Sequence, residues 1–203
     1  MRVWRDRRGT GRSMESVLLD TPDGISARLG WDPKVTVHDR RRILARELVA
    51  DKLGLELKDV RVDREAPQQF GYHTRLIATR GEEELPFVIK TASFRTATVV
   101  AIADPTFVFG LDIRDLQPDE VTIHDMQRHS HLLDESNILE LISHWTRVQA
   151  VLEADARGVR VKPEYVRLDT ARRKGWIRDR HAQYEITDLS RDAWIITLAH
   201  AKV

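Results

Sequence analysis

The sequence contains no cysteine among its 203 residues. This absence excludes disulfide bonds, thiolate nucleophiles and cysteine-ligated zinc, and it is typical of a cytoplasmic protein. No apolar run reaches the roughly 18 residues that a membrane-spanning helix needs, so we expect no membrane partner. Residues 1–12 carry five arginines but no apolar stretch, so they lack the pattern of a secretory signal.

The net charge of +1 conceals an uneven distribution of charge. Residues 1–46 hold eleven basic and six acidic side chains, residues 81–135 hold four and eleven, and residues 157–203 hold eleven and six. Basic flanks around an acidic middle suit a phosphate-rich ligand or an acidic protein partner, unless they are simply solvated helix faces. Because the basic segments lack interleaved aromatics and known reading motifs, we expect no nucleic-acid partner.

Hydrophobic periodicity predicts an α+β protein rather than a doubly wound sheet. Residues 1–35 are expected to form an irregular N-terminal arm, followed by a first α+β half over 36–105 and a second over 106–203. No internal repeat is visible in the residues. Apolar positions at 3–4 spacing predict helices at 37–55 and 137–156. Alternating stretches predict strands at 60–62, 72–79, 86–90, 97–102, 106–113, 165–168, 183–189 and 193–199.

Two segments in the second half carry the most chemical information. Phe109-Gly-Leu-Asp-Ile-Arg114 predicts an apolar strand that presents one carboxylate, Asp112, at its end. Trp145-Thr-Arg-Val-Gln-Ala-Val-Leu-Glu153 predicts the middle of an amphipathic helix whose buried stripe contains the polar Gln149. An acid at a strand end facing a polar residue on the inner side of a helix is a common arrangement in metal and phosphate sites.

These segments resemble the Sfp-type 4′-phosphopantetheinyl transferases. In that family a strand ending Gly-hydrophobic-Asp-hydrophobic-Glu precedes a helix with the pattern Trp-Thr-x-Lys-Glu-Ala-x-x-Lys. Residues 41–54 and 188–199 resemble the early helix and the final strands of the family, so the likeness covers roughly residues 38–200. It implies two similar α+β halves forming a pseudo-dimer, and a monomeric chain. It also implies an enzyme that uses coenzyme A and Mg²⁺ to attach the phosphopantetheine arm to an acyl or peptidyl carrier protein.

The residues that hold Mg²⁺ in the family are only partly present. The family uses the strand Asp, the Glu two residues later and the helix Glu; this chain keeps Asp112 but has Arg114 and Gln149 at the other two positions. The two helix lysines are replaced by Val148 and Glu153. A guanidinium cannot ligate Mg²⁺ and repels it. We therefore expect ordinary Mg²⁺-dependent transfer to be lost, with Asp112 the one metal ligand if the ion binds at all.

Candidate site residues follow from this comparison. The catalytic candidates are Asp112, Gln149, His129 and His131, the two histidines being suited to acid–base chemistry near neutral pH. The candidates for binding the phosphates of coenzyme A or phosphopantetheine are Arg41, Arg42, Lys90, Arg114 and Arg147. The simpler alternatives are a plain Asp112–Arg114 ion pair and a hydrogen-bonded core glutamine at 149.

Three functions remain open at this stage. The first is a diverged protein that recognises coenzyme A, phosphopantetheine or a carrier protein, acting as a metal-free enzyme on carrier-tethered intermediates of secondary metabolism. The second is a working transferase with an altered Mg²⁺ site, in which Asp115 or Glu153 assists Asp112. The third is a non-catalytic pseudoenzyme that binds an acidic carrier protein. The loss of two ligands and both lysines favours the first and the third.

Overall fold

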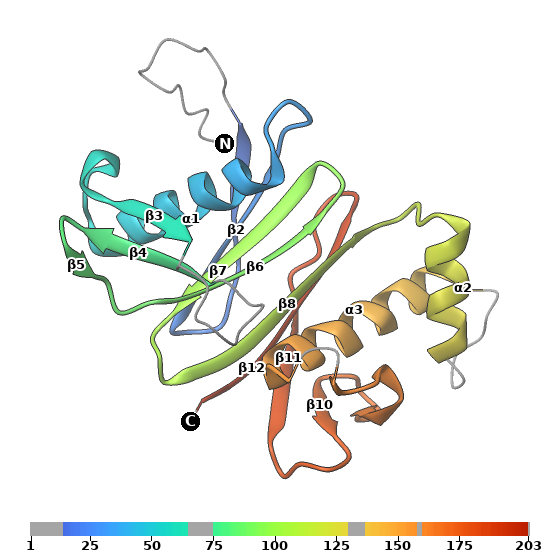
Figure 1. Ribbon diagram of the computed structural model, residues 1–203. Helices are drawn as coiled ribbons and strands as arrows, with labels where there is room; N and C mark the ends of the chain where they lie inside the picture. Colours follow the sequence, from blue (N-terminus) through green and yellow to red (C-terminus); the bar gives the residue numbers. More distant parts are fainter. Residues whose placement is uncertain (1–13, 65–74, 130–136, 158–159, 203) are drawn as a thin grey trace. The chain divides into compact units, whose positions relative to one another are not determined.

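The structure is a computed structural model that describes residues 14–64, 75–129, 137–157 and 160–202. These residues form an α+β protein with two antiparallel sheets and three helices (Figure 1). The chain divides into two compact units, Met1–Pro105 (unit 1) and Thr106–Val203 (unit 2). Within the described ranges, no helix is long and apolar enough to cross a membrane.

Unit 1 contains a seven-stranded antiparallel sheet. Its strands are β1 (Glu15–Leu19), β2 (Ile25–Trp31), β3 (Arg61–Arg64), β4 (Leu76–Arg80), β5 (Glu83–Glu84), β6 (Val88–Phe94) and β7 (Ala97–Ala103). The strand order is β1-β2-β7-β6-β4-β3, with β5 paired to β4. Every residue of β7 is buried, as its almost continuous apolar sequence favours.

The helix of unit 1 is α1 (Val37–Leu53), and it packs on the sheet (Figure 1). It begins after Thr36, whose hydroxyl accepts a hydrogen bond from the backbone N–H of Asp39 at 3.2 Å. It ends at Gly54, which has a φ of 64° that glycine adopts without a Cβ clash. A short 3₁₀ helix, η1 (Leu57–Asp59), then leads into β3. The buried core between helix and sheet includes Leu44, Leu48, Val49, Val62, Ala78, Ile89, Val100 and Ile102.

Unit 2 contains a five-stranded antiparallel sheet. Its strands are β8 (Phe107–Asp115), β9 (Val166–Leu168), β10 (Lys174–Ile177), β11 (Gln183–Asp188) and β12 (Trp194–Lys202). The strand order is β8-β12-β11-β10-β9. The long pairing of β8 with β12 places Thr197 directly opposite Asp112, so these two side chains share one face of the sheet.

Two helices complete unit 2. The shorter, α2 (Glu120–His129), begins where the Asp119 carboxylate accepts a hydrogen bond from the backbone N–H of Thr122 at 2.8 Å. The longer, α3 (Ile138–Asp155), begins at Asn137, whose side-chain oxygen accepts from the backbone N–H of Glu140. A second 3₁₀ helix, η3 (Pro163–Tyr165), precedes β9. The apolar contacts that join α2 to α3 and β12 involve Met126, Leu141, Ile142 and Ile195.

Several sequence predictions need correction. The expectation of an irregular arm over 1–35 is wrong for residues 15–31, which form β1 and β2; residues 1–13 lie outside the described ranges. Alternation at Ile25, Ala27 and Leu29 marks β2, but its pairing with β7 is distant in sequence and could not be seen locally. The helix α2 and the strand β10 were not predicted. Of the strand expected at 72–79, the described part from Leu76 onward belongs to β4.

Candidate functional site

The strand β8 directs alternate side chains towards α3. Gly110 marks this face, because a Cβ atom there would collide with the backbone of Ala150 and Ala154 on the helix. Since side chains alternate along a strand, Asp112 and Arg114 lie on the same face as Gly110. The glycine therefore allows the helix to approach the strand closely, and the next two positions on that face carry an acid and a base.

Asp112 and Arg114 form an ion pair beneath the helix. The Arg114 Nη2 atom lies 3.4 Å from the Asp112 Oδ1 atom, and the two side chains are only 21% and 13% exposed, respectively. The other carboxylate oxygen of Asp112 is buried without a hydrogen-bond partner among the described residues. Burial raises the pKa of Asp112 from 3.8 to about 7; Arg114 and the backbone N–H of Ile113 oppose the rise, and Glu153 adds to it.

The helix side of this site carries hydroxyl, amide and carboxyl groups. Thr197 donates a hydrogen bond to Thr146 of α3 at 3.0 Å, which ties the helix to the strand beside Asp112. Glu153 lies near enough to Asp112 to raise its pKa. Gln149, which is half-buried, lies between Thr146 and Glu153 on the same helix stripe by i, i+3 and i, i+4 spacing. Gln149 therefore lies on the helix stripe that carries Thr146, but Asp112 lies within β8 and not at its end as expected.

The residues of this site do not fit a Mg²⁺ ion. The guanidinium of Arg114 lies beside the one carboxylate that matches the family pattern, and its charge opposes a divalent cation. Asp115 lies on the opposite face of β8 from Asp112 by strand alternation. Its carboxylate instead accepts a hydrogen bond from the backbone N–H of Gln117 at 3.0 Å, so it does not assist Asp112. In the described part of the chain, no three His, Asp or Glu side chains are grouped to hold a metal.

His129 lies at the end of α2, against α3. Its ring stacks on Trp145 with the ring centroids 5.4 Å apart and the planes 22° from parallel. Its Nδ1 atom lies 3.1 Å from the carboxylate of Glu164 in η3. His131, the expected partner of His129, lies outside the described residues. Trp145 therefore packs against a histidine as well as against the small apolar cluster of α2 and α3.

Arg147 is directed to another acid on unit 2. Its Nη2 atom lies 4.0 Å from the Asp188 carboxylate. Burial lowers its pKa, and nearby Arg172 lowers it further while Asp188 opposes the change. No contact between Arg147 and Asp112 is seen among the described residues, so the structure places Arg147 at a distinct position on α3.

Arg41 and Lys90, two of the expected phosphate-binding residues, lie on opposite faces of the sheet in unit 1. The Nε atom of Arg41 donates a hydrogen bond to the hydroxyl of Ser93 on β6 at 3.2 Å. Lys90 is three residues before Ser93 on the same strand, so alternation puts it on the other face of the sheet. Arg42 is exposed on α1. The structure therefore does not bring Lys90 to Arg41.

Arg41 belongs to a group of arginines, which we call the arginine cluster: Arg40, Arg41 and Arg64. Burial lowers the pKa of Arg41, and the charges of Arg64 and Arg40 lower it further. On its other side, Arg64 lies 3.1 Å from the Nδ1 atom of His38. Two like charges close to one half-buried guanidinium favour an anion bound among the three.

Arg40 is the buried member of the arginine cluster and was not predicted from the sequence. It is 4% exposed and donates hydrogen bonds to the Thr98 hydroxyl and to the carbonyl oxygens of Asp32, Val35 and Arg95. Burial lowers its pKa and Asp32 opposes the change. Its position four residues before Leu44 on the buried stripe of α1 was the available sequence signal.

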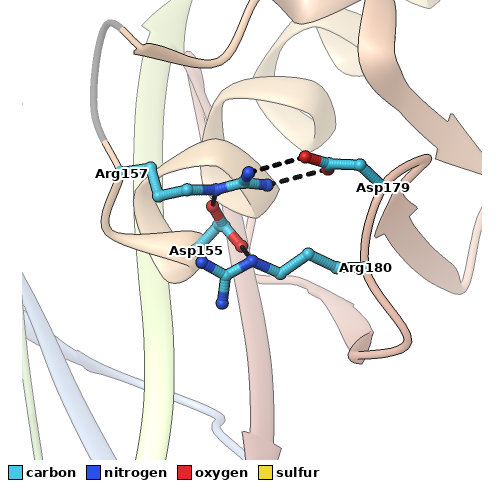
Figure 2. Close-up of polar contacts among 4 residues, drawn as sticks. All are labelled: Asp155, Arg157, Asp179 and Arg180. Carbon is cyan, nitrogen blue, oxygen red and sulfur yellow. Dashed lines mark hydrogen bonds and ion pairs between the residues drawn. The ribbon is translucent and has the colours of Figure 1, made fainter.

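A second charged network, also not predicted, lies at the C-terminal end of α3 (Figure 2). The Asp155 side chain is 1% exposed and pairs with both Arg157 and Arg180, the latter at 3.3 Å. Arg157 also forms a two-pronged hydrogen bond to Asp179 at 2.8 and 3.0 Å. These hydrogen bonds raise the pKa of Arg157, and the one from Arg157 lowers that of Asp179. Because its charges are mutually neutralised, this network supports the fold of unit 2.

No known protein-family model matches this chain, and no curated protein matches it either.

Proposed function

We propose that this protein is a diverged phosphopantetheinyl-transferase-like protein that binds coenzyme A or the phosphopantetheine arm of a carrier protein, without ordinary Mg²⁺-dependent transfer. The ligand class is a phosphate-bearing pantetheine derivative, and the protein partner is an acyl or peptidyl carrier protein. The support comes from the connection order of the two units, from the arginine cluster of unit 1 and from the Asp112–Arg114 pair of unit 2.

Apart from β1 in unit 1 and α2 in unit 2, the two units follow the same order of connections, which supports the transferase-like fold. In unit 1, β2 is followed along the chain by α1, η1 and the strands β3 to β7. The last strand, β7, pairs with β2, which gives the order β2-β7-β6-β4-β3. In unit 2 the order β8-β12-β11-β10-β9 is built in the same way around α3 and η3. Leu29-Gly-Trp-Asp32 runs to the end of β2 and one residue beyond it, whereas Phe109-Gly-Leu-Asp112 lies in the middle of β8. In this proposal the units are the two similar halves of a pseudo-dimer.

The observation that carries the ligand class is the arginine cluster. Arg41 is half-buried, bonded to Ser93 and repelled by two neighbouring arginines. A phosphate group bound there would accept charge-assisted hydrogen bonds and relieve the repulsion between guanidinium groups. Coenzyme A and the phosphopantetheine arm both supply such a phosphate, which is why we favour this ligand over an uncharged one.

In this proposal Arg114 takes the role of neutralising charge beside Asp112. A side-chain cation at this position makes a bound Mg²⁺ unnecessary for charge balance and unfavourable electrostatically. Asp112, with a pKa raised to about 7 by burial, is able to hold or release a proton near neutral pH. The chemistry that these groups support is metal-free proton transfer on a carrier-tethered or thioester-linked substrate.

Calorimetric titration of the full-length protein with coenzyme A tests the ligand class. We expect binding that is equal in Mg²⁺ and in EDTA, and that weakens about tenfold in Arg41→Ala, because a charge-assisted hydrogen bond is lost. Arg80→Ala, at an exposed position of β4, is the matched control and should bind as the unchanged protein does. Absence of coenzyme A binding, or equal weakening in both variants, contradicts the proposal.

Mass spectrometry separates this proposal from an active transferase. An apo carrier protein incubated with the protein, coenzyme A and Mg²⁺ should show no mass gain of a phosphopantetheine arm. A mass gain that depends on Asp112 would mean that transfer activity has been retained, and the proposed loss of Mg²⁺ chemistry would then be wrong.

A further inference from the structure

A pocket in unit 2 lies between the end of α2 and η3, away from the Asp112–Arg114 pair in sequence. It has a volume of about 520 Å³ and is lined by Arg128, His129, Lys162, Pro163 and Glu164. This volume is in the range of small-molecule sites. Only Pro163 offers an apolar lining side chain, so the chemistry of the pocket suits a polar, charged ligand.

The imidazole of His129 is held in place on two sides. Met126, three residues earlier on α2, is fully buried in the cluster that joins α2 to α3, and i, i+3 spacing puts His129 on the same side of the helix. The ring is stacked on Trp145, and its Nδ1 atom lies 3.1 Å from the Glu164 carboxylate without a hydrogen bond between them. Because Nδ1 is buried, Nε2 is the ring nitrogen that a ligand can reach.

The charges around the pocket leave an excess of positive charge. Glu164 is the single acid in the lining, and it is already directed at His129. Arg128 pairs with Asp125 at 2.5 Å, but both side chains are about half exposed or more, and such surface pairs are weak. Lys162 forms no ion pair with any of the described residues. A ligand that neutralises Lys162 and Arg128 must therefore be an anion.

We propose that this pocket binds a phosphomonoester group, with Lys162 and Arg128 supplying the charge and the oriented His129 ring supplying a hydrogen bond. A phosphomonoester has several acceptor oxygens on one centre, which matches three convergent donors. Trp145 is a positioning residue, because it acts on the ligand through the imidazole that it stacks on. The inference goes beyond the proposed function and does not need it, because neither the arginine cluster nor Asp112 takes part.

The test is NMR of the full-length protein, following the Cε1–Hε1 signal of His129 during titration with inorganic phosphate or methyl phosphate. The signal is assigned by its loss in His129→Gln. We expect a saturable shift with phosphate that sodium chloride at equal ionic strength does not produce. Lys162→Ala should raise the dissociation constant about tenfold. Lys174→Ala, which changes an exposed lysine of β10, should leave it unchanged.

Two further variants make the outcome decisive. In Trp145→Phe the stacking partner is smaller, so we expect weaker phosphate binding while the binding of coenzyme A by unit 1 is unaffected. Arg41→Ala should have the opposite pattern, with the His129 shift retained. An unsaturable shift, an equal response to chloride, or equal affinities in Lys162→Ala and Lys174→Ala would overturn the phosphate pocket. None of these results would depend on whether coenzyme A binds.

Discussion

The replacement Asp112→Asn tests the electrostatics beneath α3 most directly. An aspartic acid side chain ordinarily has a pKa of 3.8, but burial raises the pKa of Asp112 to about 7 in the folded protein. The folded state therefore holds a proton that the unfolded state has released whenever the pH lies between these two values. Since the folded pKa is raised, ionisation of Asp112 destabilises the folded protein as the pH rises from about 4 to about 7.

The size of this effect follows from the difference between the two pKa values. Each unit of difference corresponds to 1.36 kcal/mol, so a rise from 3.8 to about 7 amounts to a loss of about 4 kcal/mol in the free energy of unfolding above pH 7. The side chain is 13% exposed, so screening by solvent reduces this little. An asparagine carries no charge at any pH and has no such loss; the attraction of Arg114 is already included in the pKa of Asp112.

Urea unfolding of both proteins between pH 4 and pH 9 measures the effect. We expect the free energy of unfolding of Asp112→Asn, relative to the unchanged protein, to increase with pH by about 4 kcal/mol and to level off above pH 8. Other carboxylates contribute equally to both proteins, and Asp192→Asn at an exposed position provides the control. A difference that stays constant from pH 5 to pH 8 would show that Asp112 is ionised when folded, and the burial argument would be refuted.

Three further outcomes are expected. Asp155→Asn should lower the free energy of unfolding, measured in urea, by about 3 kcal/mol, because two arginines lose a buried partner. Asp179→Asn removes a carboxylate that is 65% exposed and should lower it by less than about 1 kcal/mol. Equal losses would contradict the role given to burial. Gly110→Ala should cost about 3 kcal/mol, because its Cβ meets the α3 backbone, and an unchanged urea midpoint would show that the helix does not approach so closely. Adding Mg²⁺ should raise the melting temperature of the double variant Arg114→Glu and Gln149→Glu, but not that of the unchanged protein. If Mg²⁺ has no effect on the double variant, residues other than these two also exclude the ion.

Local hydrophobic periodicity was sufficient to predict the two long helices and the strand that carries Asp112. The apolar stripe from Ile138 to Leu152 predicted α3 closely, and Gly54 predicted the end of α1 within two residues. The strands β1 and β2 were not predicted, because Gly, Asp and Pro around them favour irregular structure. The burial of β2 comes from pairing with β7, about seventy residues later in the chain, and such pairing leaves no local signal.

The sequence predicted which types of residue lie in the candidate site better than it predicted which of these residues contact one another. The plain ion pair between Asp112 and Arg114 follows from strand alternation and is present at 3.4 Å. Lys90 was grouped with Arg41 by charge, although alternation along β6 separates them. Glu164 could not be predicted as the partner of His129, because thirty-five residues and a helix separate them in the chain. The short distance between His129 and Glu164 in space depends on how α2, α3 and η3 pack together.

By itself the sequence determined the α+β class, the strand that carries Asp112 and the polar residue on the inner stripe of α3, because period-2 and period-3.6 patterns assign side chains to faces. The expectation that Asp112 ends this strand is wrong, because β8 stays paired with β12 as far as Asp115. The tertiary structure alone decided the charge states and the groupings. It buried Asp112 enough to raise its pKa, gathered three arginines around α1 and stacked His129 on Trp145. Desolvation and like-charge repulsion depend on neighbours from distant segments, and these neighbours are set only when helix and sheet pack together.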